Sequence, residues 1–565
     1  MRSVPLHLCA VVFVFLSSLV RVAAQEEKPA SHPLPPRVGV DAAPASITLE
    51  EAIRTALEQN HDVEIARLGV EESQQGVVGA EGAFDLHLMP TFEYERATTP
   101  TTSAIGGAAT GSLAQRDVSG GLGLAGRTPW LGSQFTVDLS GSRTVTNNSF
   151  ARVNPQFPTA FAFTYTQPLL RNATIDAERR QILLARRAVD LNDAQLAQVT
   201  MEQLSLIEVA FWELTFAVGN VSVQNDALQQ ARAQVSSNER QVQAGTLAVI
   251  DVVEAQTQVA TLEQSLASAQ ESLTEAENRL KNLMLADRES PMWDQPLVPS
   301  MTMDRDVPTM AVADAVRIAL ANRPELASLT AQTAQNEVDQ RYFRNQMRPQ
   351  IDLTGSYALA GLAGTLKPAV SSPLQNASDA ALLARLNDLS QRAGLEPLPA
   401  ASATGTTLPD FLQGGPGSSL TNLIENRFPT ALVQLQVDLP LRNRIAESNQ
   451  ARSVIQGREL QLRRRQLEQS VEADVRNALQ RVRSAKQRLR SAGSAQRNAR
   501  EQYDSERRRF ESGLSTVFLV LQRQTALVTA QGQELRARAD LNEAVALFDR
   551  AIGTTLTEHG VTLQR

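Results

Sequence analysis

The chain has 565 residues and a formal net charge of −7, with one cysteine, five histidines and 4% aromatic residues. So few thiol and imidazole side chains do not favour an enzyme with a metal or thiol centre, and a mildly acidic total does not support nucleic-acid binding. Long stretches rich in alanine, glutamine, glutamate and arginine are typical of extended helices rather than compact cores.

The N-terminal segment is typical of a signal peptide. Arg2 precedes an apolar run at residues 8–20, and Val22-Ala23-Ala24 supplies small residues for cleavage. The only cysteine, Cys9, lies in this run, so the mature chain expected from Gln25 has none. Past residue 24 we find no apolar stretch of the 18 or so residues that a spanning helix needs. We therefore expect any membrane crossing to use β-strands.

The mature chain repeats one plan twice. After the signal peptide (1–24) and a proline-rich lead-in (25–46), the repeats are expected at 47–300 and 301–565. Residues 56–63 match 319–326, and Pro168-Leu169-Leu170-Arg171-Asn172 matches Pro440-Leu441-Arg442-Asn443. Such self-similarity predicts a duplicated architecture. Each repeat is expected to contain an opening helix, a strand region, a very long helix, a glycine turn and a return helix.

The expected helix lengths suggest how each repeat is built. The opening helices are predicted at 49–84 and 311–348. The long helices between Pro168 and Gly245, and between Pro440 and Gly513, would each measure about 110 Å at 1.5 Å per residue. The return helices end near Leu285 and Gly553. An opening helix and a return helix placed end to end are as long as one uninterrupted helix, so each repeat should supply two equal columns.

Both return helices carry apolar residues at alternating spacings of three and four, which predicts coiled-coil seams. An ordinary solvent-covered coiled coil would show the same pattern. Glu534 interrupts the second seam. The seam residues are Val252, Ala255, Val259, Leu262, Leu266, Ala269, Leu273, Ala276, Leu280 and Leu283 in the first helix, and Val520, Leu527, Ala530, Ala537, Leu541, Ala544, Phe548 and Ala551 in the second.

The strand regions alternate between apolar and polar residues. This pattern suits a wall with lipid on one side and water on the other, although a soluble sandwich would show it equally. A further hairpin is possible near 117–125 and 133–143, which leaves four or six strands open. Residues 362–429 are expected to be an external loop with a short helix around 377–392. The alternating apolar residues are Phe161, Phe163 and Tyr165, then Val433, Leu435, Val437 and Leu439, with partners near 86–94 and 351–357.

The sequence indicates no catalytic, cofactor-binding or metal site. Gly121, Gly123 and Gly126 match the G-x-G-x-x-G spelling of dinucleotide-binding loops, but a strand-like run follows them where that motif requires a helix. His61 and His559, like the other histidines, have no neighbouring metal-ligand spacing. A basic bias at 458–509 and an acidic bias at 181–243 indicate either solvated helix faces or neighbouring columns of opposite charge.

The two glycine turns are the most specific local feature. Each places glycine where one helix must stop and another begin, with Thr or Ser as an available N-cap. A plain helical-hairpin turn would explain the glycines, but apolar residues on an exposed tip predict a docking surface. The tip residues are Gly245, Thr246, Leu247 and Val249 in the first repeat, and Gly513, Leu514, Ser515, Thr516, Val517 and Phe518 in the second.

The order and duplication of these motifs resemble the TolC-like outer-membrane efflux protein family. The resemblance covers nearly the whole mature chain. It implies a mainly α protein with a transmembrane β-barrel portion, in which a homotrimer shares one outer-membrane barrel and extends an α-barrel tunnel into the periplasm. The motifs include Thr48-Leu49-Glu50-Glu51-Ala52, Gln167-Pro168-Leu169-Leu170, Ala210-Phe211-Trp212-Glu213-Leu214, Asn322-Arg323-Pro324-Glu325-Leu326 and both glycine turns.

The family resemblance also implies partners and a tunnel mouth. An adaptor (membrane fusion) protein and an inner-membrane transporter would open the tunnel at its tips. Some members carry acidic residues around the mouth at positions that look like Leu519 and Gln522 here, while Asp251 and Glu254 are the acids of the first tip. A cation-selective acidic gate is therefore not expected.

The function implied is a passive export duct, the outer-membrane component of a tripartite efflux or type I secretion system. We expect no enzymatic activity, no cofactor and no nucleic-acid partner. A periplasmic coiled-coil scaffold is the alternative. It would explain the heptads, but not the signal peptide together with duplicated amphipathic strands.

Overall fold

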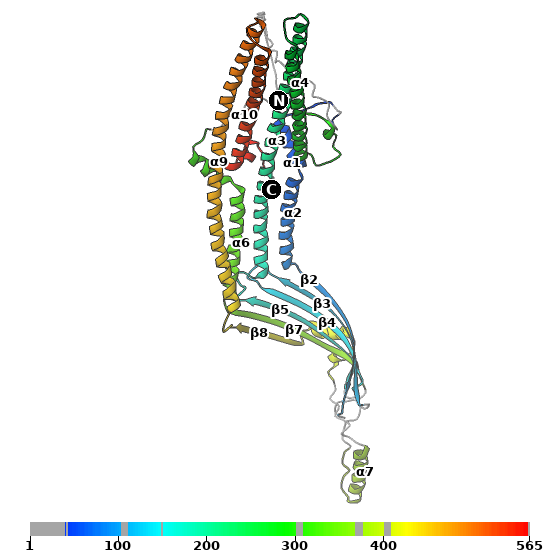
Figure 1. The fold of residues 1–565 in the computed structure, drawn as a ribbon. Helices are drawn as coiled ribbons and strands as arrows, with labels where there is room; N and C mark the ends of the chain where they lie inside the picture. Colours follow the sequence, from blue (N-terminus) through cyan, green and yellow to red (C-terminus); the bar gives the residue numbers. More distant parts are fainter. Residues whose placement is uncertain are drawn as a thin grey trace, which may run out of the picture.

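The computed structural model describes residues 40, 43–102, 111–148, 151–300, 309–367, 377–399 and 408–562. The expected signal peptide and most of the proline-rich lead-in lie outside these residues. The molecule is elongated, with long helices at one end and a large twisted sheet at the other, as Figure 1 shows.

Eight helices form the rod. The first half supplies α1 (Leu49–Gln59), α2 (His61–Glu81), α3 (Ala177–Gln243) and α4 (Val249–Met284), and the second supplies α5 (Val312–Asn322), α6 (Pro324–Gln346), α9 (Arg444–Glu511) and α10 (Val517–Ile552). Figure 1 shows α4 continuing the column of α1 and α2 beside α3, and α10 standing beside the far part of α9. Two columns from each half are therefore confirmed.

Each opening helix is broken, contrary to the expectation of one continuous helix. In the first half, the Asn60 Oδ1 accepts from the N–H groups of Asp62 and Val63, at 2.9 and 3.1 Å, which starts α2. Asn60 Nδ2 also donates to Leu283 O at 2.9 Å, near the end of α4. In the second half Pro324 begins α6, because proline has no N–H for a continuing helix. Gly553, just past α10, lies against Asn322 and Arg323, so both breaks lie where the return helices end.

The coiled-coil seams are confirmed as core. In α4, Leu273 and Leu280 are fully buried, and every predicted seam residue of α10 is buried. Glu534 pairs with Arg538 at 2.9 Å and its side chain is 23% exposed, so the carboxylate that interrupts the seam is not buried in the core. α10 ends at Ile552, where Gly553 has a φ of 77° that suits glycine as a helix terminator.

One stretch of α3 is apolar enough, by length and composition alone, to cross a membrane. The expectation of no such stretch past residue 24 is therefore wrong. Nearly half of the stretch (44%) is buried inside the chain, and Phe211 and Trp212 are fully buried in the core formed with α1 and α4, their rings meeting edge to face. Its hydrophobicity therefore belongs to a packed core helix.

The two oppositely biased long helices are not main packing partners of each other in the described chain. Among the described residues, α3 packs mainly on α2, α4, α6 and α10, and α9 packs on α5, α6 and α10. Several α9 arginines instead pair with carboxylates one turn away on the same helix, as Arg463 does with Glu459 at 2.6 Å and Arg476 with Glu472 at 2.7 Å. These contacts favour solvated helix faces.

The large sheet settles the strand number for the described part of the chain. Its six strands are antiparallel and lie in the order β2-β3-β4-β5-β7-β8. The possible hairpin is real, and it lies between β2 and β5. The strands are β2 (His87–Pro100), β3 (Ser112–Arg127), β4 (Gln134–Thr146), β5 (Val153–Pro168), β7 (Gln350–Leu366) and β8 (Phe428–Asp438).

Short elements complete the fold. β1 (Ala45–Ile47) pairs in parallel with β6 (Leu297–Pro299) beside the helices. The predicted short helix is α7 (Ala377–Arg392). A second helix that the sequence did not reveal, α8 (Pro416–Ile424), packs on β5 and β7. The other elements are η1 (Gly82–Phe84), η3 (Pro291–Asp294), η4 (Asp410–Leu412) and α11 (Thr555–Glu558).

Candidate channel wall and helix tips

The sheet separates apolar from polar side chains across all six strands. Successive residues of a strand point to opposite faces, and directly paired residues share a face. Because Phe163 pairs with both Val137 and Tyr357, one face can be followed from β2 to β8. Along this apolar face lie Leu88, Phe92, Tyr94, Leu122, Leu124, Phe135, Val137, Leu139, Phe161, Phe163, Tyr165, Leu353, Tyr357, Val433, Leu435 and Val437.

The opposite face is polar, with threonine, serine and glutamine beside several carboxylates. The Thr166 and Thr354 hydroxyls meet at 3.2 Å on this face, and Thr144 donates to Asp117. On the apolar face Phe92 and Val433 are 79% and 78% exposed, far more than a water-facing surface favours. The carboxylates of the polar face belong to Glu93, Glu95, Asp117, Asp138, Asp352 and Asp438.

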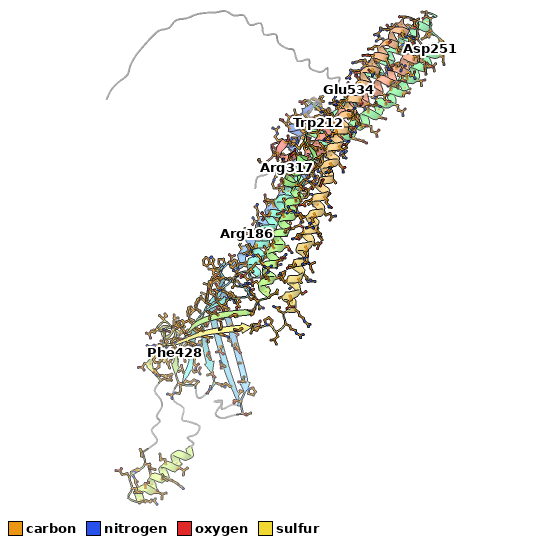
Figure 2. All side chains as sticks on the ribbon, turned by 90° about the vertical axis from the view of Figure 1, so that its left-hand side faces the viewer. Arg186, Trp212, Asp251, Arg317, Phe428 and Glu534 are labelled. Carbon is orange, nitrogen blue, oxygen red and sulfur yellow. The ribbon has the colours of Figure 1, made fainter. Side chains whose placement is uncertain are left out.

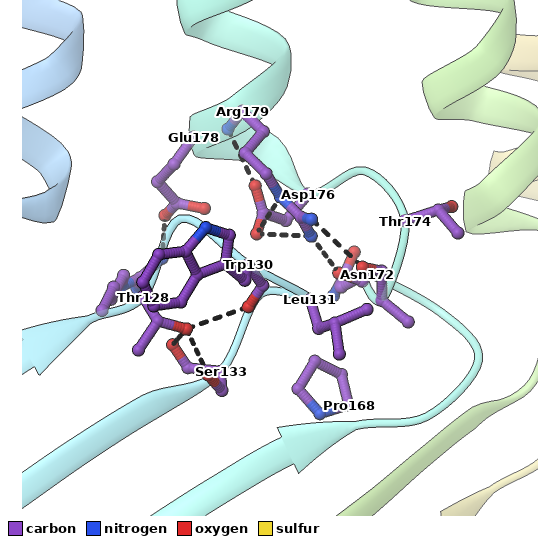
Figure 3. Close-up of polar contacts among 12 residues, drawn as sticks. Thr128, Trp130, Leu131, Ser133, Pro168, Asn172, Thr174, Asp176, Glu178 and Arg179 are labelled. Atoms are coloured by element: carbon purple, nitrogen blue, oxygen red, sulfur yellow. Dashed lines mark hydrogen bonds and ion pairs between the residues drawn. The ribbon is translucent and has the colours of Figure 1, made fainter.

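The turn of the β3–β4 hairpin is fastened to the start of α3, as Figure 3 shows. Arg127 pairs with Glu178. Gly132 has a φ of 67°, and a Cβ there would lie 2.6 Å from Asn172 O. Arg179 donates to that same carbonyl at 2.6 Å and pairs with Asp176 at 3.0 Å. The hairpin is therefore an integral part of the wall.

The first tip joins α3 to α4 through a left-handed glycine, as expected. Gly245 has a φ of 74°, and Thr246 N donates to Gln241 O at 2.9 Å. Thr246 is not the N-cap of α4, because its hydroxyl donates to Gln241 O at 3.0 Å. Ala248 holds the N-cap position instead, and its N–H donates to the Asp251 carboxylate at 3.2 Å. Figure 2 shows Asp251 at the far end of the helices.

The second tip repeats this arrangement with a different cap. Gly513 has a φ of 74°. Thr516 is the N-cap of α10, accepting from Leu519 N at 3.4 Å. Ser515 instead donates its hydroxyl to Glu506 on α9. One of the two hydroxyl residues therefore caps the return helix, and the other fastens the turn to the long helix.

The apolar tip residues divide into a buried and an exposed set. Val517 is 1% exposed and packs with Ala255 and Leu521, and Leu247 is half-buried against this cluster. The expectation that Val517 is exposed is therefore wrong, and Leu247 is only partly exposed. Val517 lies three residues before Val520, the first predicted seam residue of α10, so it continues the seam by one turn, a signal that the sequence contained. The exposed apolar residues are Val249, Ile250, Leu514 and Phe518.

The four expected mouth residues lie on the first turns of α4 and α10. Glu254 and Gln522 line one groove of about 700 Å³ between these helices, together with Phe518. Leu519 is 36% exposed, and Asp251 is engaged in the α4 cap. Two of the four residues thus share a groove, and neither Leu519 nor Asp251 lines it.

The described residues contain no group of three or more His, Cys, Asp or Glu side chains that could hold a metal ion. Gly121, Gly123 and Gly126 lie within β3 and pair with β4, so no helix receives a phosphate there. These three glycines are part of the sheet.

Comparison with known proteins identifies this architecture. The family described as outer membrane efflux protein matches residues 134–284 and 417–554, and the chain belongs to that family. It is an outer-membrane protein that serves as a duct for efflux. No curated protein matches the sequence significantly.

Solved channel structures have the same fold at low sequence identity. The Campylobacter jejuni CmeC outer membrane channel is 13% identical, with 90% of this chain and 86% of that chain covered and a TM-score of 0.58. The Vibrio cholerae outer membrane protein VceC is 14% identical, covering 89% and 96%, with a TM-score of 0.57. The open state of the Neisseria gonorrhoeae MtrE channel is 15% identical, covering 90% and 89%, with a TM-score of 0.55.

Proposed function

We propose that three copies of this chain close one barrel and one tunnel, through which substrates leave passively from an inner-membrane transporter to the exterior. The observation that carries this proposal is the two-faced sheet, whose edge strands β2 and β8 have no partner on their outer side in the described chain. β8 runs antiparallel to β2 through the sheet order, so β8 of one copy can pair with β2 of the next. Three copies of six strands fall within the range of known outer-membrane barrels.

The two faces of the sheet assign its orientation in that barrel. Lipid covers the apolar face, which carries Phe92 and Val433, and water fills the polar side. The helices then extend into the periplasm, and the end of the sheet remote from them faces the exterior. The division of the chain into repeats at 47–300 and 301–565 belongs to the same proposal and accounts for the two columns that each half supplies.

The tips are the proposed contact for a periplasmic adaptor protein. Val249, Ile250, Leu514 and Phe518 leave apolar area exposed at the end of a rod whose other apolar residues are largely packed. Gly245 and Gly513 hold the turns in the shape that presents them. Both small-molecule efflux and type I secretion are compatible with this arrangement, and the inner-membrane transporter would select the substrate.

Cysteine labelling tests the barrel orientation directly. The only cysteine, Cys9, lies in the expected signal peptide, so a single introduced cysteine is the one thiol of the mature chain. Thr164→Cys should react with a charged maleimide from the aqueous side, and Phe163→Cys, one residue away on the opposite face, should be protected by lipid. Equal labelling of both positions would refute the orientation, and a monodisperse monomer by sedimentation in detergent would refute the trimer.

Adaptor docking is tested by introducing a charge among the exposed apolar residues of the tips. Leu514→Asp should abolish transport while trimers still insert into the outer membrane. Leu382→Asp is the matched control, because Leu382 is also a well exposed leucine, on α7 beyond the other end of the sheet. Wild-type transport by Leu514→Asp would remove the docking assignment. Release of the protein with soluble periplasm would instead support the coiled-coil scaffold.

A further inference from the structure

Three arginines gather on the apolar face of the sheet, at the end remote from the helices. Arg96 on β2 pairs directly with Arg116 on β3. Arg143 on β4 pairs with Val118, two residues along β3 from Arg116, which places it on the same face as a diagonal neighbour of Arg116. All three side chains are exposed. The structure therefore presents three adjacent guanidinium groups on an otherwise apolar surface.

This arrangement has an electrostatic cost that the described chain does not offset. Like charges directly opposite each other on paired strands destabilise a sheet. The strand carboxylates occupy the other face, and none of the three arginines has an ion pair with a described residue. Arg127 shows the contrast, because it lies on the polar face and pairs with Glu178. An anion from outside the described chain would supply the compensation.

The depth of the cluster indicates where that anion comes from. On β2 the apolar face runs from Leu88 through Phe92 to Arg96, and Leu86, just before the strand, lies against Gly126 on the same face. Ten residues at about 3.3 Å each, tilted by about 40°, rise about 25 Å along the membrane normal. The apolar band of an outer-membrane barrel is about 25 Å tall. The arginines therefore lie at the upper border of the band, at the level of the outer-leaflet headgroups.

Helix α8 supports the placement of this end of the sheet at the membrane border, because it lies at the same level on the neighbouring strands. It packs on the apolar face at the outer ends of β5 and β7, where Thr159 Oγ1 and Ser419 Oγ lie 2.9 Å apart. Gly361 has no side chain at this contact, and a Cβ there would collide with Ser419 O. The outer side of α8 exposes Leu420 and Ile424, at 43% and 72%. An apolar surface thus continues beside the arginines, as a lipid-covered wall requires.

We propose that Arg96, Arg116 and Arg143 bind the phosphate groups of a phosphorylated glycolipid in the outer leaflet. Guanidinium groups bind phosphate through paired, charge-assisted hydrogen bonds, and three of them on adjacent strands can share a headgroup with two phosphates. The bound headgroup offsets the repulsion between Arg96 and Arg116, and its acyl chains cover the apolar face below. The inference rests on the proposed orientation, in which this face is outward.

The test measures binding of bisphosphorylated lipid A to the purified full-length protein in detergent by native mass spectrometry. The variant Arg96→Gln/Arg116→Gln/Arg143→Gln should bind lipid A about tenfold more weakly or worse, because it loses the charge-assisted contacts. Monophosphorylated lipid A should bind wild type more weakly than the bisphosphorylated form. The variant Arg463→Gln/Arg464→Gln/Arg465→Gln makes the same charge change on α9, far from the sheet, and should bind like wild type.

Several outcomes would overturn the inference. Wild-type affinity in the triple sheet variant would do so, as would an equal loss in the α9 control. Displacement of lipid A by an equal concentration of inorganic phosphate would show a free-anion site instead. If the triple variant does not fold, Arg116→Gln, in the middle of the cluster, should still weaken binding measurably, and unchanged binding there would also refute the site. The Phe163→Cys and Thr164→Cys labelling reports failure of the orientation separately.

Discussion

Arg536 Nη1 on α10 lies 2.5 Å from Glu213 Oε2 on α3, and this ion pair ties the second half of the chain to the first. Asp540 and Glu543 on α10 are also within ion-pair distance of the same guanidinium, at 2.7 and 3.6 Å. Three carboxylates therefore share one cation. Burial, opposed by Arg536 and reinforced by the neighbouring carboxylates, raises the pKa of Glu543 to about 7.

This cluster predicts that stability falls as the pH rises from about 4.5 to about 7. A carboxyl whose pKa is higher in the folded state than its ordinary value stabilises the fold when protonated. That contribution is complete below the unfolded pKa, is lost as Glu543 ionises, and stays lost above pH 7. Thermal unfolding in detergent, followed by circular dichroism from pH 4.5 to 8, should show this decline, and Glu543→Gln should reduce its slope. An unchanged slope would contradict the assignment.

A buried ion pair on α4 predicts a large stability effect. Lys281 Nζ lies 2.6 Å from Glu277 Oε1, and both side chains are at most 2% exposed. The ammonium also donates to Trp293 O and Gln295 O, at 2.8 and 2.7 Å. Lys281→Met would leave a carboxylate buried without its cation, so the free energy of unfolding should fall by about 3–5 kcal/mol.

Two controls separate this effect from general disturbance of α4. The exposed pair Arg232–Glu263 has a similar distance of 2.7 Å, and Arg232→Met should cost less than about 1 kcal/mol because solvent screens it. Adding Glu277→Leu to Lys281→Met should restore much of the lost stability. Chemical denaturation of each variant in detergent measures these differences. Equal costs for the buried and exposed pairs would contradict the prediction.

The hairpin turn in Figure 3 gives a prediction about glycine. Gly132 and Gly245 both have a positive φ, of 67° and 74°. Alanine at either position costs about 1–2 kcal/mol for the left-handed backbone. A Cβ at Gly245 meets nothing within 4 Å, whereas one at Gly132 would crowd Asn172 O and the Asp176 carboxylate. Gly132→Ala should therefore lower the melting temperature more than Gly245→Ala, and the reverse order would show that the turn is not anchored to α3.

Local patterns in the sequence predicted most of the helices, because heptad spacing, turn glycines and repeated motifs are local signals. They placed the ends of α4 and α10 at Leu285 and Gly553, and the strand alternation at Phe163 and Val433. Other features depend on contacts between distant segments. The break at Asn60 is joined to Leu283, and α8 is held on the sheet by Thr159, so neither could be recognised from its own segment.

The candidate site was predicted less completely for the same physical reason. Burial of Val517 depends on Ala255 from the other half of the chain. The arginine cluster became visible only through the pairing register, because Arg96, Arg116 and Arg143 are dispersed along the sequence and share a face only when the strands align. A shift of one residue in the register of a strand would place its arginine on the opposite face of the sheet.

The expected tunnel mouth gives a prediction about ion selectivity. Leu519 is partly exposed on the first turn of α10, and three copies around the proposed threefold axis would form an apolar ring. The ring would then oppose ion flow because it is narrow and poorly hydrated, and not because it carries fixed charge. Leu519→Asp adds three carboxylates that raise the local cation concentration, so single-channel recordings under a salt gradient should shift towards cations. As a control, Thr257→Asp places the same charge on α4, one turn beyond Glu254 in the groove and away from the Leu519 ring. This variant should shift the ion selectivity less.

The competing explanation is that the acids of the first tip already control ion flow. Glu254 lines the groove between α4 and α10, while the Asp251 carboxylate accepts from Ala248 N and is held by the helix cap. If these acids dominated, wild type would be strongly cation-selective, and Asp251→Asn/Glu254→Gln would abolish the selectivity. The apolar ring instead predicts weak selectivity in wild type that grows in Leu519→Asp and changes little when Glu254 alone is neutralised. Because Glu254→Gln leaves the Asp251 cap intact, it separates the charge effect from any loosening of the tip.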